Sequence, residues 1–145
     1  MKHLSVLFFL LISLLGGLPQ KKCPLNKGII TVNKLIPLLH SPRHRVQIKS
    51  CHHSDHKVYG TVRATVRKII QRPTFYTIYL QGIDGMEYRM TNLKTVSVKV
   101  GEAIDAGEEI GTVDKSTVNS FLYFSVWKDG AEQDAWGFVD CNCER

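Results

Sequence analysis

The sequence predicts an all-β domain, a compact sandwich or open barrel built from short, mostly antiparallel strands. Three stretches support this prediction. Apolar and polar residues alternate strictly over 58–66, glycines punctuate a valine-rich run over 96–113, and aromatic and β-branched residues dominate 121–126. The chain of 145 residues contains no convincing amphipathic helix and no internal repeat, so a helical or solenoid architecture is not expected.

The alternation over 58–66 predicts one continuous strand, because a helix cannot keep a two-residue period. Residues 41–57 are polar and rich in histidine, which favours turns and loops. Residues 35–39 fit a short strand or one helical turn, since Pro37 limits any longer helix. Further strands are expected at 75–80, 86–90, 96–100, 109–113 and 121–127, with turns at 82–85 and 129–130.

The first twenty residues have the layout of a secretory signal peptide. A short basic start precedes an apolar run over 4–15, which is too short to span a bilayer comfortably, and small residues follow. We therefore expect a secreted, extracellular protein without membrane insertion. An N-terminal arm would cover 21–43 and a single β domain would cover 44–145.

Four cysteines remain after removal of such a peptide: Cys23, Cys51, Cys141 and Cys143. An oxidising compartment favours disulfides over a zinc–thiolate site. Three connectivities are possible, and the sequence does not choose among them. Cys141 and Cys143 could close a tight, strained ring, or the C-terminus could be clamped onto earlier strands.

Charge is distributed unevenly along the chain. Residues 21–77 hold twelve Lys or Arg and one acid, a net +11, whereas 78–145 hold six basic and twelve acidic residues, a net −6. The two halves either neutralise each other in the fold or leave the first half for an acidic partner. Arg63, Arg67 and Lys68 are the candidate polyanion-binding residues, with a sulfated glycan or an acidic cell-surface receptor as partner. Nucleic acid is not expected, since no stacking motif is present.

The glycine-punctuated run and the strand Phe121–Val126 together resemble the C-terminal half of the lysostaphin-type zinc metallopeptidase domain, over roughly residues 44–139. In that family the corresponding strand carries His-x-His, and these histidines bind zinc or work beside it. The resemblance places Phe121 and Tyr123 at the two histidine positions. Neither side chain is an ordinary zinc ligand.

The family's first metal motif is a histidine followed four residues later by an aspartate, before a strand that Val58-Tyr59-Gly60 matches here. With one extra residue in the alignment, His44 and Ile48 take these positions. Without it, Arg45 and Lys49 take them. The carboxylate is missing in both alignments, so the resemblance implies a degenerate site without metal or cofactor, and a protein that is not an enzyme. Phe121, Tyr123 and Ser125 would then fill a former cleft, either as core or as a shallow groove.

A secreted branch of the family, the leukocyte cell-derived chemotaxins, carries an N-terminal cysteine that pairs with one just after the first metal motif. This resemblance implies a Cys23–Cys51 disulfide and a secreted, non-catalytic binding or signalling role. The alternative is a secreted metal-dependent hydrolase that uses a rearranged histidine cluster. Its ligands would come from His52, His53, Asp55 and His56.

Overall fold

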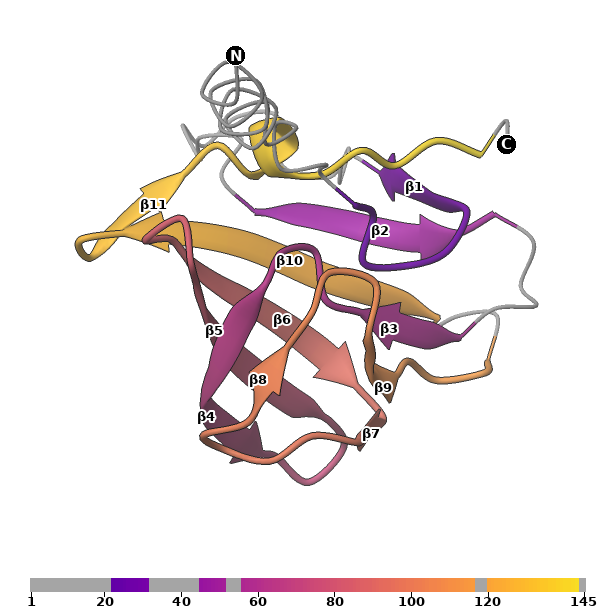
Figure 1. The fold of residues 1–145 in the computed structure, drawn as a ribbon. Helices are drawn as coiled ribbons and strands as arrows, with labels where there is room; N and C mark the ends of the chain where they lie inside the picture. Colours follow the sequence, from indigo (N-terminus) through magenta and orange to yellow (C-terminus); the bar gives the residue numbers. More distant parts are fainter. Residues whose placement is uncertain (1–21, 32–44, 52–55, 117–119, 144–145) are drawn as a thin grey trace, which may run out of the picture.

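The computed structural model describes residues 22–31, 45–51, 56–116 and 120–143. Two antiparallel sheets make up the domain (Figure 1). The main sheet runs in the order β1 (Gly28–Thr31), β2 (Val46–Ser50), β10 (Phe121–Lys128), β6 (Glu87–Leu93), β5 (Tyr76–Gly82), β4 (Ala64–Gln71) and β8 (Ala103–Ile104), and β11 (Ala131–Gln133) also pairs with β10. The small sheet holds β3 (Lys57–Tyr59), β9 (Glu109–Thr112) and β7 (Thr95–Val96), and a 3-10 turn, η1 (Ala135–Phe138), follows β11.

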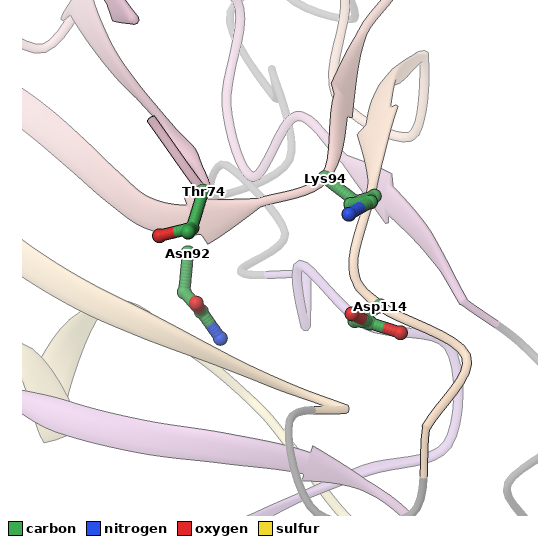
Figure 2. Close-up of a pocket in the computed structure, with 4 residues that line it drawn as sticks. All are labelled: Thr74, Asn92, Lys94 and Asp114. Atoms are coloured by element: carbon green, nitrogen blue, oxygen red, sulfur yellow. The ribbon is translucent and has the colours of Figure 1, made fainter. Parts of the chain in front are cut away.

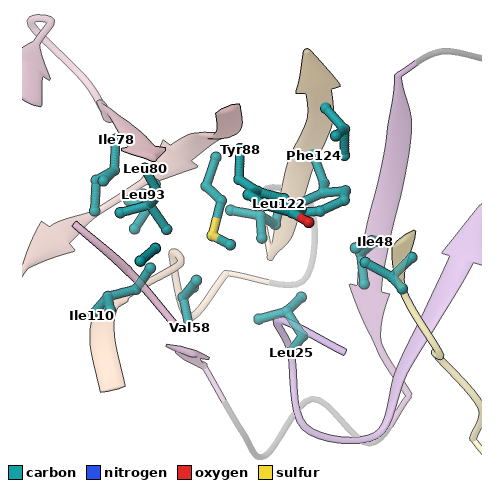
Figure 3. Close-up of a cluster of buried hydrophobic side chains, with 14 of the residues drawn as sticks. Leu25, Ile48, Val58, Ile78, Leu80, Tyr88, Leu93, Ile110, Leu122 and Phe124 are labelled. Atoms are coloured by element: carbon teal, nitrogen blue, oxygen red, sulfur yellow. The ribbon is translucent and has the colours of Figure 1, made fainter. Parts of the chain in front are cut away.

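The hydrophobic core lies between the small sheet and one face of the main sheet (Figure 3). Leu122 and Phe124 of β10 meet Val58 of β3 and Ile110 of β9 in one continuous cluster, and all four are fully buried. The fold is therefore a β-dominated open sandwich with no α-helix in the described residues, which confirms the predicted fold class. None of the described segments is a helix long and apolar enough to cross a membrane.

Strand β10 is the interior strand that the sequence predicts. It lies between β2 and β6, and its even-numbered residues Leu122, Phe124 and Val126 are all fully buried in the core. The odd-numbered residues face the other side of the sheet, because successive side chains of a strand alternate between its faces. Thus β10 contributes one face to the core and one to the candidate site.

The expected continuous strand over 58–66 is wrong. It breaks after Tyr59 into β3 of the small sheet and β4 of the main sheet. Gly60 sits at the break, where its N–H donates to the Glu108 carbonyl at 2.9 Å and its carbonyl accepts from Gly107 N–H at 2.8 Å. A methyl group on Gly60 would lie 2.9 Å from the Asp105 carbonyl oxygen. The packing against the β8–β9 turn therefore needs glycine, and a two-residue period cannot report that change of sheet.

Two further strand predictions need correction. Residues 46–50 were expected in a polar loop, yet they form β2, because Val46, Ile48 and Ser50 all point inward and are buried. The strand expected at 96–100 is reduced to β7, which ends at Val96. In both places the decisive feature is the partner strand, which lies far away in sequence. The short strand or turn expected at 35–39 falls outside the described residues.

The disulfides are Cys23–Cys141 and Cys51–Cys143, so the expected Cys23–Cys51 pair is wrong. Both bonds tie the C-terminal segment to the part of the chain that contains β1 and β2. This is the C-terminal clamp that the sequence left open as an alternative. Figure 1 shows that segment running beside β1. The Cα atoms of each pair lie 4.9 and 5.8 Å apart, within the usual range, and Cys141 packs against the core. Each cysteine pairs with one that is close in the folded structure, although the two are 118 and 92 residues apart in sequence.

Candidate functional site

The outer face of the main sheet, defined as the side opposite the core, carries the two positions where the resemblance expects histidines. Phe121 and Tyr123 are half-buried there, and neither belongs to the core cluster. Their rings meet edge to face, with centroids 5.1 Å apart. The structure therefore places these two rings on the outer face of the sheet rather than in the core.

The register between β2 and β10 shows which residues of β2 share this face with Phe121 and Tyr123. Directly opposed residues of antiparallel strands project to the same side, and the register places Lys49 opposite Phe121 and Gln47 opposite Tyr123. Ile48 instead opposes Leu122 and is fully buried in the core. Ile48 therefore does not share the outer face with Phe121 and Tyr123. Its partner in the alignment with one extra residue, His44, lies outside the described residues.

The other alignment uses Arg45 and Lys49. Lys49 opposes Phe121, and Arg45 immediately precedes β2, whose first residue, Val46, pairs with Phe124. Both side chains are exposed, and the register places Lys49 on the outer face. A cationic side chain thus accompanies Phe121 and Tyr123 there, with Arg45 just before the start of β2.

A cationic row crosses the outer face at right angles to the strands. Lys68, Tyr79, Arg89 and Ser125 oppose one another in turn across β4, β5, β6 and β10, and Arg45 immediately precedes β2, the next strand of the sheet. The Lys68 Nζ lies 5.7 Å from the Tyr79 ring centroid, and the Arg89 guanidinium carbon lies 5.0 Å from the same centroid. Tyr79 thus stands between two cations, each in reach of a cation–π contact.

Arg89 also contacts Trp127 and Glu87. The guanidinium carbon lies 3.9 Å from the Trp127 ring centroid, and Arg89 Nε donates to Glu87 Oε1 at 2.6 Å. Trp127 Nε1 donates to Ser125 Oγ at 3.2 Å. Ser125 is the small residue between Tyr123 and Trp127 on the same face, and it is 4% exposed. Ser125 therefore lies between two aromatic residues of this face, and Trp127 contacts both Ser125 and Arg89.

A second row, of hydroxyl and amide groups, lies next to the cationic row. Thr77, Thr91, Tyr123, Gln47 and Thr31 oppose one another across β5, β6, β10, β2 and β1. Thr77 Oγ1 donates to Thr91 Oγ1 at 3.2 Å, and Thr31 Oγ1 donates to Gln47 Oε1 at 2.9 Å. This part of the outer face is neutral and offers hydrogen-bonding groups.

The three predicted polyanion-binding residues do not form one group. Arg63 precedes β4 and pairs with Asp105 at 3.3 Å, and Arg67 sits at the β-bulge between Val66 and Lys68. Only Lys68 is placed in the cationic row. Lys57 also pairs with an acid of the second half, Glu109, at 3.3 Å, so part of the charge asymmetry is neutralised inside the fold.

The alternative histidine cluster is described only at its last member. His56 Nδ1 lies 3.2 Å from Ser120 Oγ, immediately before Phe121. His52, His53 and Asp55 lie outside the described residues. Within 22–31, 45–51, 56–116 and 120–143, no three His, Cys, Asp or Glu side chains are grouped so as to hold a metal ion.

A polar cavity of about 360 Å³ lies at the Phe121 end of β10, lined by Thr74, Asn92, Lys94 and Asp114 (Figure 2). Asn92 adopts a left-handed backbone conformation with φ of 79°. Its side-chain Nδ2 donates to the Phe121 carbonyl at 2.8 Å. The cavity therefore borders the strand that carries the aromatic pair, and sequence patterning gave no sign of it.

Tyr79, Arg89 and Trp127 were also missed from the sequence. They come from three strands that meet only in the folded sheet, and each by itself is an ordinary outward-facing residue. The only available signal was the alternation within each strand, which points these three side chains away from the core. That alternation shows that they share a site only once the register between β5, β6 and β10 is known.

The fold is a two-sheet β sandwich whose outer face carries aromatic and cationic side chains. Residues 46–135 match peptidase family M23, and the chain belongs to that family. A search of curated proteins finds no match.

Three solved structures show the same fold at low sequence identity. A chain in the SpoIIQ–SpoIIIAH pore-forming complex gives a TM-score of 0.64 at 15% identity, with 87% of this chain and 94% of that chain covered. A chain in a second SpoIIIAH–SpoIIQ complex gives 0.55 at 21% identity, covering 80% and 79%. A zinc-containing peptidase from Vibrio cholerae gives 0.54 at 16% identity, covering 80% of this chain and 35% of that one.

Proposed function

We propose that this chain is a secreted, non-catalytic binding or signalling protein, chemotaxin-like in role, built on the M23 peptidase frame. One observation carries the proposal. The family resemblance puts Phe121 and Tyr123, and in one alignment Arg45 and Lys49, at the zinc-ligand positions, and Lys49, Phe121 and Tyr123 share the outer face. The peptidase groove would therefore serve to bind a partner rather than to cleave one.

The donor set does not fit zinc. Catalytic zinc takes three protein ligands from His, Cys, Asp or Glu and leaves one position for water. Phenylalanine offers no lone pair, and two protonated cationic side chains repel a divalent cation. No hydrolytic step through a metal can be derived from these residues.

The partner would be a cell-surface receptor or a sulfated glycan. An expected signal peptide and two disulfides support an extracellular setting. That similar chains occur in SpoIIQ–SpoIIIAH complexes supports partner binding as a use of this fold. The outer face also supplies tyrosine, tryptophan and arginine, the residues most enriched at binding hot spots.

Metal analysis of the protein purified from a secreting host tests the proposal. We expect no stoichiometric zinc and no cleavage of glycine-rich peptides, with or without added zinc. One tightly held zinc per chain that is lost in His52→Ala or His56→Ala, together with peptide cleavage, would overturn the proposal in favour of the rearranged hydrolase.

A further inference from the structure

We propose that the outer face binds an anionic glycan, a chain of sulfated or carboxylated sugars that lies along the cationic row across the strands. This inference rests on the proposed non-catalytic function and specifies its ligand. It also replaces the sequence-based candidate patch, because Arg63 is paired with Asp105 and Arg67 sits at a bulge.

The spacing of the cations favours an extended polyanion. Lys68 and Arg89 come from β4 and β6, and Arg45 immediately precedes β2; these three are alternate strands of the sheet. Neighbouring strands lie about 4.8 Å apart, so successive cations recur at about 10 Å along the row. A linear chain with regularly repeated acidic groups can meet all three at once.

Charge on this face is only partly compensated. Glu87 pairs with Arg89, and Glu132 lies opposite Trp127 at the far end of the face. Arg45, Lys49 and Lys68 form no salt bridge with any described acidic residue. The acids Asp105 and Glu109 lie on or beside the strands β8 and β9, where they pair with Arg63 and Lys57. The face is therefore net positive although the second half of the chain is acidic.

The uncharged groups favour sugars over an acidic polypeptide. Tyr123 and Trp127 lie on either side of Ser125 along β10 and are half-buried, and aromatic rings provide apolar surface on which a sugar ring can pack. The adjoining row of Thr77, Thr91, Gln47 and Thr31 offers hydroxyl and amide groups to sugar hydroxyls. An acidic peptide would need main-chain partners, which a sheet offers at its edges rather than on its face.

Cationic side chains in place of metal ligands would also change the ligand that the site attracts, from a metal cation to an anion. In one alignment of the family resemblance, the positions that would hold imidazole and carboxylate around zinc carry Arg45 and Lys49. Cations at these positions would attract anions. Arginine adds a planar fork suited to sulfate and carboxylate oxygens.

Tryptophan fluorescence tests the inference directly, because the chain has only two tryptophans. Trp136→Phe leaves Trp127 as the single reporter, and Trp127→Phe leaves Trp136, which is exposed on η1. Titration with a defined heparin oligosaccharide should change the Trp127 signal in a saturable way and leave the Trp136 signal unchanged. The affinity should fall as salt is raised, because screening acts over about 8–10 Å at 0.1–0.15 M.

A matched pair of triple variants tests the residues. Arg45→Gln with Lys49→Gln and Lys68→Gln should weaken binding about tenfold or more, given the worth of three exposed charge contacts. The control, Lys99→Gln with Lys115→Gln and Lys128→Gln, removes the same charge from exposed lysines elsewhere and should change affinity far less. Circular dichroism should show that both variants keep the fold.

Three results would overturn the inference: no oligosaccharide binding at low salt, equal losses in the two triple variants, or equally tight binding of poly-glutamate with the same Trp127 response. The last would assign the face to acidic polypeptides. None of these would affect the proposed function, which depends on zinc content and peptide cleavage measured separately.

Discussion

The two faces of strand β10 have different roles: one packs in the core and the other carries the candidate binding residues. On one face Leu122, Phe124 and Val126 are fully buried in the core. On the other, Tyr123 and Trp127 are half-buried and border a row of cations. The core face determines that the chain folds as an M23 sandwich, whereas the outer face determines what the sandwich can do. Zinc ligands can thus be lost from the outer face without removing a core contact.

The comparison predicts unequal costs for aromatic truncation on the two faces. Phe124→Ala should lower the free energy of unfolding by about 3–5 kcal/mol, because Phe124 is fully buried and packs against Tyr88, with ring centroids 6.0 Å apart. Tyr123→Ala should cost about 1 kcal/mol or less, the usual worth of a cross-strand side-chain pair. Denaturant unfolding of both variants measures the difference, and equal costs would show that Tyr123 belongs to the core after all.

The disulfides hold the C-terminal segment against the core, so their removal should weaken that side of the sheet. Cys23→Ala with Cys141→Ala should destabilise the protein by about 2–5 kcal/mol, because the bond closes a loop with a sequence separation of 118. Denaturation under non-reducing conditions measures this cost. Peptide mapping provides the check on connectivity, and a fragment linking Cys23 to Cys51 would contradict the structure.

Tyr88 makes the core face sensitive to alkali. Its ring is buried and its hydroxyl donates a hydrogen bond to Asp84. Burial foremost, and then the bond to Asp84 and its negative charge, raise the pKa of Tyr88 above the ordinary value of about 10. The folded state therefore keeps this proton at a pH where the unfolded state loses it.

Stability should consequently fall as the pH rises above about 10, because there the unfolded state binds fewer protons than the folded state. Tyr88→Phe should remove this part of the decline, since phenylalanine has no proton to retain. Unfolding free energies of both proteins measured from pH 9 upward provide the test. Parallel decline in the two proteins would assign the alkaline sensitivity to other groups.

The smallest change in stability is expected for a residue on neither face of β10, Arg63. Arg63 and its partner Asp105 are mostly exposed, so Arg63→Gln should change the unfolding free energy by about 0–1 kcal/mol. It should also leave binding to heparin oligosaccharides nearly unchanged, whereas Lys68→Gln should weaken it. The reverse order would return the polyanion site to the patch that the sequence indicated.

The sequence by itself determined the β class, the interior strand at 121–127 and the presence of Phe121 and Tyr123 where the family resemblance expects histidines. These follow from local patterns, because a two-residue period and a side-chain identity can be read without knowing any partner. The same logic explains the failure over 58–66, where an unbroken period runs through Gly60 although the chain changes sheets there.

Only the tertiary structure decided the disulfide partners, the burial of Ile48 and the alignment of Lys68 and Arg89 in one row. Each of these depends on the register between strands that are distant in sequence, and a slip of one residue would exchange the two faces. Register is set by the packing of the whole core, so it does not appear in any short stretch of the chain. For that reason the aromatic residues at the expected histidine positions could be seen in the sequence, while the cationic face beside them could not.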